Sequence, residues 1–281
     1  MTNKKKIRLL ICAVILLALV AWTVWSNITL DVTEYTIQSP EIPTAFDGFT
    51  IAQVSDLHNS AMGKPGGKLL AALQGAQPDI IAITGDMIDS RHTDIPAALE
   101  FAAEAVKIAP CYYVPGNHES RISEYETLKQ GLLDLGVTVL ENEKVEIHHS
   151  GETINLLGVM DPSFEADYWQ VFPEDVMDKN VGDLSQESGF TILLSHRPEM
   201  VDIYAQHSID LALSGHAHGG QVRLPFVGAV YAPGQGLFPK YDAGLFEKEN
   251  TTMIVSRGIG NSVIPLRFHN PPELVLITLT Q

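Results

Sequence analysis

The stretch Leu213-Ser214-Gly215-His216-Ala217-His218-Gly219-Gly220-Gln221 closes an apolar run and places two histidines two residues apart between glycines. Side chains two apart in a strand point to the same side, and a turn just beyond the strand can also aim both rings into one pocket. The glycines permit positive φ angles and a close approach to the backbone. The pattern indicates a metal centre at the end of a strand. A polar loop with two unrelated histidines is the alternative for this stretch alone.

The composition fits one folded domain of ordinary size with an appendage. The chain has 281 residues, of which 45% are hydrophobic and 19% are charged. Its formal net charge of −16 makes it a poor candidate for binding nucleic acid, whose phosphates require lysine and arginine. The two cysteines, Cys12 and Cys111, form no CxxC motif and are not expected to meet. A thiolate zinc site is therefore excluded.

The N-terminus predicts a single membrane-spanning helix. Residues 1–8 are basic and are expected to lie in the cytoplasm, and residues 9–25 carry no charge. Trp22 and Trp25 are suitable interfacial anchors, so residues 9–25 are expected to form an uncleaved signal anchor with the rest of the chain outside the cytoplasm. A cleaved signal peptide is the alternative. Residues 26–48 are expected to form a juxtamembrane strand and linker, followed by a catalytic domain over 49–281.

The remaining chain first alternates strands with helices and then becomes rich in strands, which predicts a layered α/β sandwich. The region 161–188 has no clear period and is expected to be an insertion that could form a cap. The expected helices are 69–76, 96–108, 123–135 and a short one from 198 to about 206. The expected strands are 27–37, 49–55, 79–84, 111–114, 137–140, 144–149, 153–160, 190–194, 209–213, 252–256 and 274–279.

The polar residues of interest share one position, because each follows an apolar strand at its carboxyl end. In α/β sheets this is the edge where ligands bind. Carboxylates, an amide and imidazoles without thiolates suit manganese, iron or zinc better than calcium, which takes oxygen ligands. The candidates are Asp56, His58, Asp86, Asn117, His118, His196, His216 and His218.

These motifs, in this order, resemble the calcineurin-like metallophosphoesterases. The matching segments are Asp56-x-His58, Gly85-Asp86, Gly116-Asn117-His118-Glu119, His196 and Gly215-His216-Ala217-His218. The membrane-anchored start, His218-Gly-Gly-Gln-Val-Arg-Leu-Pro225 and Ser256-Arg-Gly-Ile-Gly260 are most similar to the bacterial membrane-anchored phosphodiesterase branch of this family. The resemblance runs from Phe49 to the C-terminus. It implies an α/β/β/α sandwich of two mixed sheets and a location at the bacterial cell membrane.

The resemblance also implies a role for each matching residue. Two divalent metal ions would be bound, one by Asp56, His58 and His218 and the other by Asn117, His196 and His216, with Asp86 bridging both. His118 would bind no metal and would stabilise the transition state or protonate the leaving oxygen. The implied activity is that of a phosphodiesterase in which a hydroxide between the metals, about 3.5–4 Å apart, attacks phosphorus in line.

Four residues near these motifs keep open roles. The run Gly85-Asp86-Met87-Ile88-Asp89-Ser90-Arg91 has its arginine displaced by one position from the phosphatase branch, so no role in substrate binding is carried over to Arg91. Asp89 is expected either to orient His118 or to form a turn. Arg223 and Arg257 either bind substrate phosphate or pair with carboxylates, and pairing is favoured for Arg257.

Other functions remain as alternatives. The expected substrate is a phosphoester, with a lipid-linked or cell-envelope compound suggested by the anchor and the apolar loop 226–246. A pyrophosphatase acting on a UDP-2,3-diacylglucosamine-type lipid precursor is a second candidate, although that substrate would lie on the cytoplasmic side. A non-catalytic scaffold of the same fold and a metal-dependent hydrolase of another bond, such as an amide, are the candidates from other classes.

Overall fold

The computed structural model describes residues 3–167, 170–185, 188–261 and 265–281. Two six-stranded mixed sheets form the centre of the domain. The first has the order β1 (Asp31–Gln38), β16 (Glu273–Thr280), β2 (Thr50–Val54), β3 (Ile80–Thr84), β4 (Cys111–Val114), β5 (Thr138–Val139). The second has the order β14 (Gly244–Lys248), β15 (Thr251–Val255), β9 (Leu211–Ser214), β8 (Thr191–Leu194), β7 (Glu152–Gly158), β6 (Glu143–His149).

Three apolar layers hold the sheets and helices together, which confirms the expected α/β/β/α sandwich. One lies between the first sheet and helices α2 (Lys68–Ala76), α3 (Ile95–Ala105) and α4 (Tyr125–Asp134). The second lies between the two sheets. The third lies between the second sheet and helices α5 (Pro173–Leu184) and α6 (Val201–Gln206). Strands β3, β8 and β9 are buried along their whole length, as expected of parallel strands covered on both faces.

Helix α5 corrects one sequence-based expectation. The region 161–188 was expected to be an insertion that could cap the site, but its residues 173–184 form a helix that packs against α6 in the outer layer. Val176, Met177 and Val181 supply its buried stripe. Most of the other residues of the helix are polar, so α5 is only weakly apolar overall. Residues 168–169 and 186–187 of this region lie outside the described part of the chain.

The segment that follows α1 (Asn3–Ile28) is built into the domain. Strand β1 pairs in parallel with β16 from Asp31 to Gln38, with Glu273 and Thr280 as the end partners. Ile42 and Phe46 are fully buried in the layer between the sheets. Residues 31–46 therefore contribute to the core.

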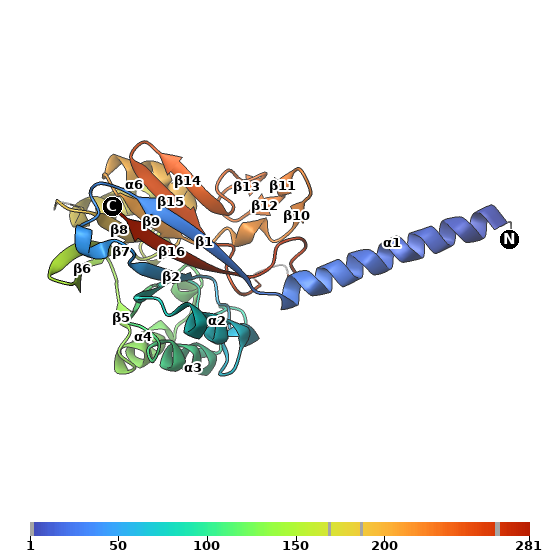
Figure 1. Ribbon diagram of the computed structural model, residues 1–281, viewed down its shortest axis with the longest axis horizontal. Helices are drawn as coiled ribbons and strands as arrows, with labels where there is room; N and C mark the ends of the chain where they lie inside the picture. Colours follow the sequence, from blue (N-terminus) through green and yellow to red (C-terminus); the bar gives the residue numbers. More distant parts are fainter. Residues whose placement is uncertain (1–2, 168–169, 186–187, 262–264) are drawn as a thin grey trace.

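Helix α1 (Asn3–Ile28) leaves the domain as a long continuous rod, as Figure 1 shows. It is long and apolar enough to cross a bilayer, and it could be a membrane anchor or a signal sequence. A helix satisfies its own backbone hydrogen bonds, which is required in a lipid environment. Most of its side chains are exposed, and Ser26 near its end is fully buried against the domain.

Four very short strands between β9 and β14 form two hairpins. Strand β10 (Arg223–Leu224) pairs with β11 (Gly228–Ala229), and β12 (Tyr231–Ala232) pairs with β13 (Gly236–Leu237). Figure 1 shows them on the side of the domain from which α1 departs.

The role of residues 31–46 in the core can be tested through Phe46. Its ring lies 5.0 Å from that of Phe49 between the sheets. The Phe46→Ala substitution should lower the free energy of unfolding by about 3–5 kcal/mol, because it removes a buried aromatic ring and leaves a cavity. Urea unfolding of the full chain in detergent measures this loss. Phe172→Ala, at a side chain that is 52% exposed, is the control and should change the free energy by less than about 0.5 kcal/mol. Equal effects would contradict the assignment.

Candidate metal centre

The first group of ligand-type side chains is Asp56, His58, Asp86 and His218, all buried. Asp56 and His58 follow β2, Asp86 follows β3, and His218 follows β9 of the other sheet. His218 Nε2 lies 3.2 Å from Asp56 Oδ1 and 3.2 Å from His58 Nε2. His58 Nε2 lies 3.5 Å from Asp86 Oδ2. These four side chains therefore enclose one small space between the sheets.

The second group is Asp86, His196 and His216, so the two groups share Asp86. His196 Nε2 lies 3.1 Å from Asp86 Oδ2, and His216 Nδ1 lies 3.2 Å from His196 Nε2. The other ring nitrogen of His196 lies 2.8 Å from the Thr84 carbonyl oxygen, to which it donates a hydrogen bond that directs Nε2 toward Asp86. The two neighbouring histidines of the glycine-rich stretch, His216 and His218, thus fall into different groups.

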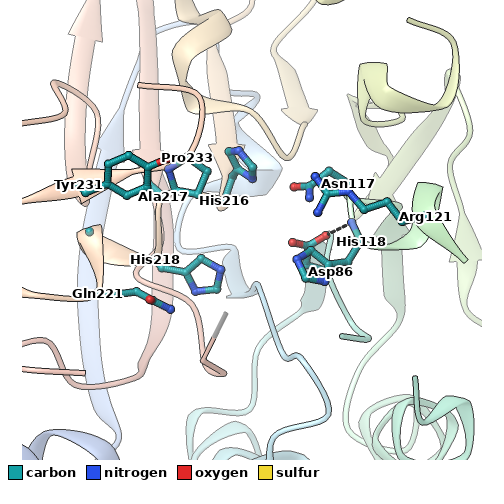
Figure 2. Close-up of a pocket in the computed structure, with 11 residues that line it drawn as sticks. Asp86, Asn117, His118, Arg121, His216, Ala217, His218, Gln221, Tyr231 and Pro233 are labelled. Atoms are coloured by element: carbon teal, nitrogen blue, oxygen red, sulfur yellow. Dashed lines mark hydrogen bonds between the residues drawn. The ribbon is translucent and has the colours of Figure 1, made fainter. Parts of the chain in front are cut away.

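Asn117 and His118 come from the loop after β4 and face the same cavity. Figure 2 shows them with Asp86 and Arg121 on one side of the pocket and His216, His218 and Tyr231 on the other. The cavity has a volume of about 370 Å³. Among the described residues, the buried Oδ1 of Asn117 has no hydrogen-bond partner. An unpaired buried amide oxygen in a cavity lined by imidazoles has the chemistry of a metal ligand.

The spacing of these atoms fits divalent cations. Metal–ligand bonds of about 2.0–2.2 Å place neighbouring ligand atoms about 2.8–3.6 Å apart when their angles lie between octahedral and tetrahedral values. Within the two groups, the five neighbouring pairs of ligand atoms given above lie 3.1–3.5 Å apart, and His58 Nε2 lies 3.9 Å from Asp56 Oδ1. The buried aspartate and histidine clusters are consistent with a dinuclear metal site.

The backbone at these positions is strained. Asp56, His58, Asp86, His216 and His218 have φ angles of 51°, 44°, 53°, 65° and 50°. Residues with a Cβ rarely adopt positive φ. Each instance costs about 1–3 kcal/mol and persists only where the surrounding structure enforces it. The concentration of such residues at one site indicates a geometry that is maintained for function rather than for stability.

Glycines make the close approach of the strand ends possible. A Cβ on Gly215 would lie 1.9 Å from Ser55 Oγ and 2.4 Å from Asp56 Oδ2. A Cβ on Gly116 would lie 2.3 Å from Asp86 Oδ1. Any side chain at these two positions would displace the carboxylates, so the glycines before His216 and Asn117 are steric requirements of the site.

Comparison with known proteins agrees with this geometry. The model of the calcineurin-like phosphoesterase family matches residues 49–220, more than half of the chain. The chain belongs to the calcineurin-like phosphoesterase family. The resemblance recognised from the sequence motifs is thereby confirmed.

Three similar proteins illustrate the relationship. Uncharacterized metallophosphoesterase YkuE of Bacillus subtilis is 32% identical over 270 residues, covering 89% of this chain and 85% of that protein. An uncharacterized metallophosphoesterase of Helicobacter pylori is 37% identical over 203 residues, covering 72% of this chain and 51% of that longer protein. The crystal structure of TT1561 from Thermus thermophilus has a TM-score of 0.50 at 14% identity, covers 75% of this chain and 90% of its own, and shows the shared fold alone.

His118 lies beside the metal clusters of this phosphoesterase domain without belonging to either. Its ring stands edge-on to that of His58 at a centroid distance of 4.5 Å. The backbone N–H of Ser90 donates to His118 Nδ1 at 3.0 Å. When the ring is neutral its proton must therefore be on Nε2, which makes Nε2 a hydrogen-bond donor. Of the two roles that the family resemblance implies, such a donor suits stabilisation of the transition state.

Glu119 is a positioning residue to which the sequence motif assigned no role. Its buried carboxylate accepts hydrogen bonds from the backbone N–H groups of Asp86 at 3.0 Å, Ile88 at 3.2 Å and Gly116 at 2.8 Å. It thus joins the loop after β3 to the loop after β4. Burial and the nearby charge of Asp86 raise the pKa of Glu119 to about 8. Its place in Gly116-Asn-His-Glu119 was the available sequence signal.

A buried ion pair supports the second cluster from outside. Arg197 donates from Nε to Asp161 Oδ2 at 2.5 Å and from Nη2 to Asp161 Oδ1 at 3.0 Å. Its Nη1 lies 3.3 Å from His216 Nε2, on the ring edge opposite the cluster. Arg197 directly follows His196 in the chain, but no sequence pattern indicated its partner Asp161, which follows β7. The sequence motifs therefore did not predict the ion pair of Arg197 with Asp161.

The four residues with open roles form ion pairs. The Arg91 guanidinium binds Asp89, and Asp89 Oδ1 lies 3.7 Å from His118 Nδ1, beyond hydrogen-bonding distance. Asp89 therefore shapes the turn instead of orienting His118 by a direct bond. Arg223 pairs with Asp242 at 2.6 Å. Arg257 pairs with Glu273 at 2.9 Å and Asp31 at 3.2 Å, as expected for this residue.

Burial sets the protonation states of the clusters. Burial lowers the pKa of His58 to about 4 and holds the pKa of His216 and His218 well below their usual range, so these rings are neutral at pH 7. Burial also lowers the pKa of His196, but the adjacent carboxylates of Asp86 and Asp56 outweigh it and raise that pKa to about 10. His196 must therefore release a proton before it can bind a cation.

Metal content should separate the two clusters. Manganese-loaded wild-type protein should retain two ions after dialysis, and Asp86→Asn should retain almost none because it removes the shared carboxylate. His216→Ala and His218→Ala should each retain about one ion, as measured by inductively coupled plasma mass spectrometry. His92→Ala, at an exposed histidine outside the clusters, is the matched control and should retain both. Full double occupancy in either cluster variant would rule out the division of ligands.

Metal affinity should rise with pH. Protons compete with cations for His196, so the apparent affinity should increase steadily from pH 6 to pH 8.5 as the proton becomes easier to displace. Isothermal titration calorimetry in buffers of different ionisation enthalpy measures both the affinity and the number of protons released. Binding that is independent of pH and releases no proton would contradict the assigned protonation of His196.

Proposed function

We propose that this protein is a dinuclear metal-dependent phosphodiesterase held at a bacterial membrane by helix α1. The observation that carries the proposal is the pair of buried clusters sharing Asp86, with His118 placed as a donor beside them. Manganese, iron and zinc are the cations that this mixture of carboxylate, amide and imidazole groups suits. The family membership and the intact set of ligands support a hydrolase rather than a scaffold.

The ligand residues would divide the work as follows. Asp56, His58 and His218 would hold one cation, Asn117, His196 and His216 the other, and Asp86 both. Bound cations would polarise the phosphoryl oxygens and activate a water molecule for attack on phosphorus. The protein's own contribution is to hold these side chains in a buried, strained arrangement that needs no rearrangement when substrate arrives.

His118 and Arg121 would act directly on the substrate. Burial lowers the pKa of His118, so the ring is neutral near pH 7. Its Nε2–H would then donate a hydrogen bond to the oxygen on which charge develops in the transition state. Arg121 follows in the same loop, lines the pocket and is exposed. Its guanidinium is available for a non-bridging phosphate oxygen or for the second ester substituent.

The proposed membrane location follows from the charge pattern around α1. Lys4, Lys5, Lys6 and Arg8 lie in the first turns of α1, before its uncharged stretch, and predict a cytoplasmic N-terminus. The catalytic domain is therefore proposed to lie outside the cytoplasm. A phosphoester of the cell envelope or of a lipid would be accessible there. A pyrophosphate-containing lipid precursor on the cytoplasmic side would require the opposite orientation. A C-terminal alkaline phosphatase fusion that is active in cells would agree with the first arrangement, and an inactive one would favour the second.

The activity is tested with manganese-loaded full-length protein and bis(p-nitrophenyl) phosphate. Wild type should release p-nitrophenolate, and Asp86→Asn should reduce turnover to background. His118→Ala should lower kcat by about 10²–10³-fold while retaining both metal ions, because it removes only a hydrogen-bond donor to the transition state. His92→Ala should behave as wild type.

The outcomes distinguish the candidate functions. The enzyme proposal fails if wild type carrying both metal ions hydrolyses phosphodiesters, phosphomonoesters and pyrophosphates no faster than Asp86→Asn does. A scaffold of this fold is then indicated. If His118→Ala matches wild type in kcat, the role of His118 is wrong although the metal centre stands.

A further inference from the structure

The two hairpins between β10 and β13 expose large apolar side chains to an unusual degree. Phe226 at the tip of the first hairpin is fully exposed, and Leu237 and Phe238 are 69% and 65% exposed. Large apolar side chains that are exposed together in one segment of a domain indicate an interaction site. The hairpin patch is defined here as Leu224, Phe226, Val227, Tyr231, Leu237 and Phe238.

The hairpin patch is fixed relative to the end of the membrane helix. The Trp22 ring lies 5.4 Å from that of Phe268, and the Ser26 hydroxyl accepts a hydrogen bond from the His269 N–H at 3.1 Å. Phe268 in turn bonds the base of the first hairpin, accepting from Arg223 N–H at 3.0 Å and donating to the Gln221 carbonyl oxygen at 3.1 Å. A short chain of contacts therefore joins α1 to the hairpins.

A second contact strengthens this link. The Asn27 side chain bonds the backbone of Arg267 in both directions, through Nδ2 to the carbonyl oxygen at 2.8 Å and through Oδ1 from the N–H at 2.9 Å. Figure 1 shows the hairpins on the side of the domain toward which α1 extends. A bilayer that contains α1 therefore approaches the hairpin patch.

The charge distribution favours a bilayer as the covering surface. The chain contains 34 acidic residues among 281, but residues 211–241 and 250–272 contain none. These two segments hold the hairpins and the loop that contacts α1. Their exposed cation is Lys240, two residues after Phe238, while Arg223 at the base of the first hairpin pairs with Asp242 and Arg267 is buried. Anionic lipid headgroups repel carboxylates and attract lysine and arginine, so a strongly acidic protein can approach the membrane only through such a face.

We propose that the hairpin patch docks on the bilayer that holds α1, with its most exposed side chains, those of Phe226, Leu237 and Phe238, inserted at the boundary between headgroups and acyl chains. Aromatic and aliphatic side chains flanked by cationic ones are suited to this interface. The hairpins also reach the metal centre, because Tyr231 and Pro233 line its pocket. Docking therefore places the pocket mouth at the level of the headgroups. Given the proposed function, on which this step rests, the position of the pocket mouth selects phosphoesters of membrane lipids as the substrate class.

The depth of the hairpin patch in the membrane is measured with a fluorescent label attached to the full chain. Cys12→Ala removes the exposed cysteine and leaves only the buried Cys111. A nitrobenzoxadiazole group is attached to Phe226→Cys, and the protein is reconstituted in phosphatidylethanolamine–phosphatidylglycerol vesicles with and without spin-labelled lipid. The same label on Leu133→Cys is the matched control, because Leu133 is 43% exposed on α4, away from the hairpins. Spin-labelled lipid should quench the label at position 226 several-fold more than that at position 133.

Two results would overturn the docking. Equal quenching at the two positions would mean that the hairpin patch stays in water. A label at position 226 that is shielded without lipid quenching, to an extent that grows with protein density in the vesicle, would mean that a second copy of the chain covers the patch.

The substrate class is tested separately with Phe226→Ser/Phe238→Ser. This variant should turn over soluble bis(p-nitrophenyl) phosphate at the wild-type rate and lose activity several-fold toward phosphodiester lipids in vesicles. An equal rate on the vesicles would overturn the lipid selectivity. Lipid quenching together with no turnover of either substrate by wild type would leave the docking established and reject the proposed function.

Discussion

The carboxylate of Asp86 contacts ligand-type side chains that follow strands of both sheets. It is buried, it accepts a hydrogen bond from the backbone N–H of His118 at 2.8 Å, and it lies against His196 and His58 from different strands. Burial raises its pKa, but the surrounding imidazoles, above all His196, outweigh this and hold the pKa well below its usual range. A buried carboxylate is costly unless positive charge compensates it. Bound cations would therefore stabilise this buried carboxylate.

Much of the chemistry could be predicted from the sequence because the polar residues follow strands directly. The carboxyl ends of parallel strands converge, so Asp56, Asp86 and Asn117 of one sheet and His196 and His216 of the other had to meet if the fold was right. What could not be predicted are partners that depend on distant pairing. Asp161 reaches Arg197 across 36 positions, and no local pattern records such a contact.

The differences between the predicted and the observed fold also concern features that the local sequence pattern does not record. Helix α5 is mostly polar, with few apolar residues to mark its buried face, so the sequence around it resembles an irregular insertion. Strand β1 alternates clearly, but alternation does not identify a strand's neighbour. Its parallel pairing with β16, at the other end of the chain, is what makes the residues after α1 part of the domain. This pairing also ties the segment after α1 to the sheet that carries Asp56 and Asp86.

The sharing of Asp86 between two cations is the central claim, and diffraction from crystals grown with manganese tests it most directly. Anomalous difference density recorded near the manganese edge should show two peaks flanking the Asp86 carboxylate, about 3.5–4 Å apart, with His218 beside one and His216 beside the other. A single peak, or two peaks of which neither contacts Asp86, would contradict this claim.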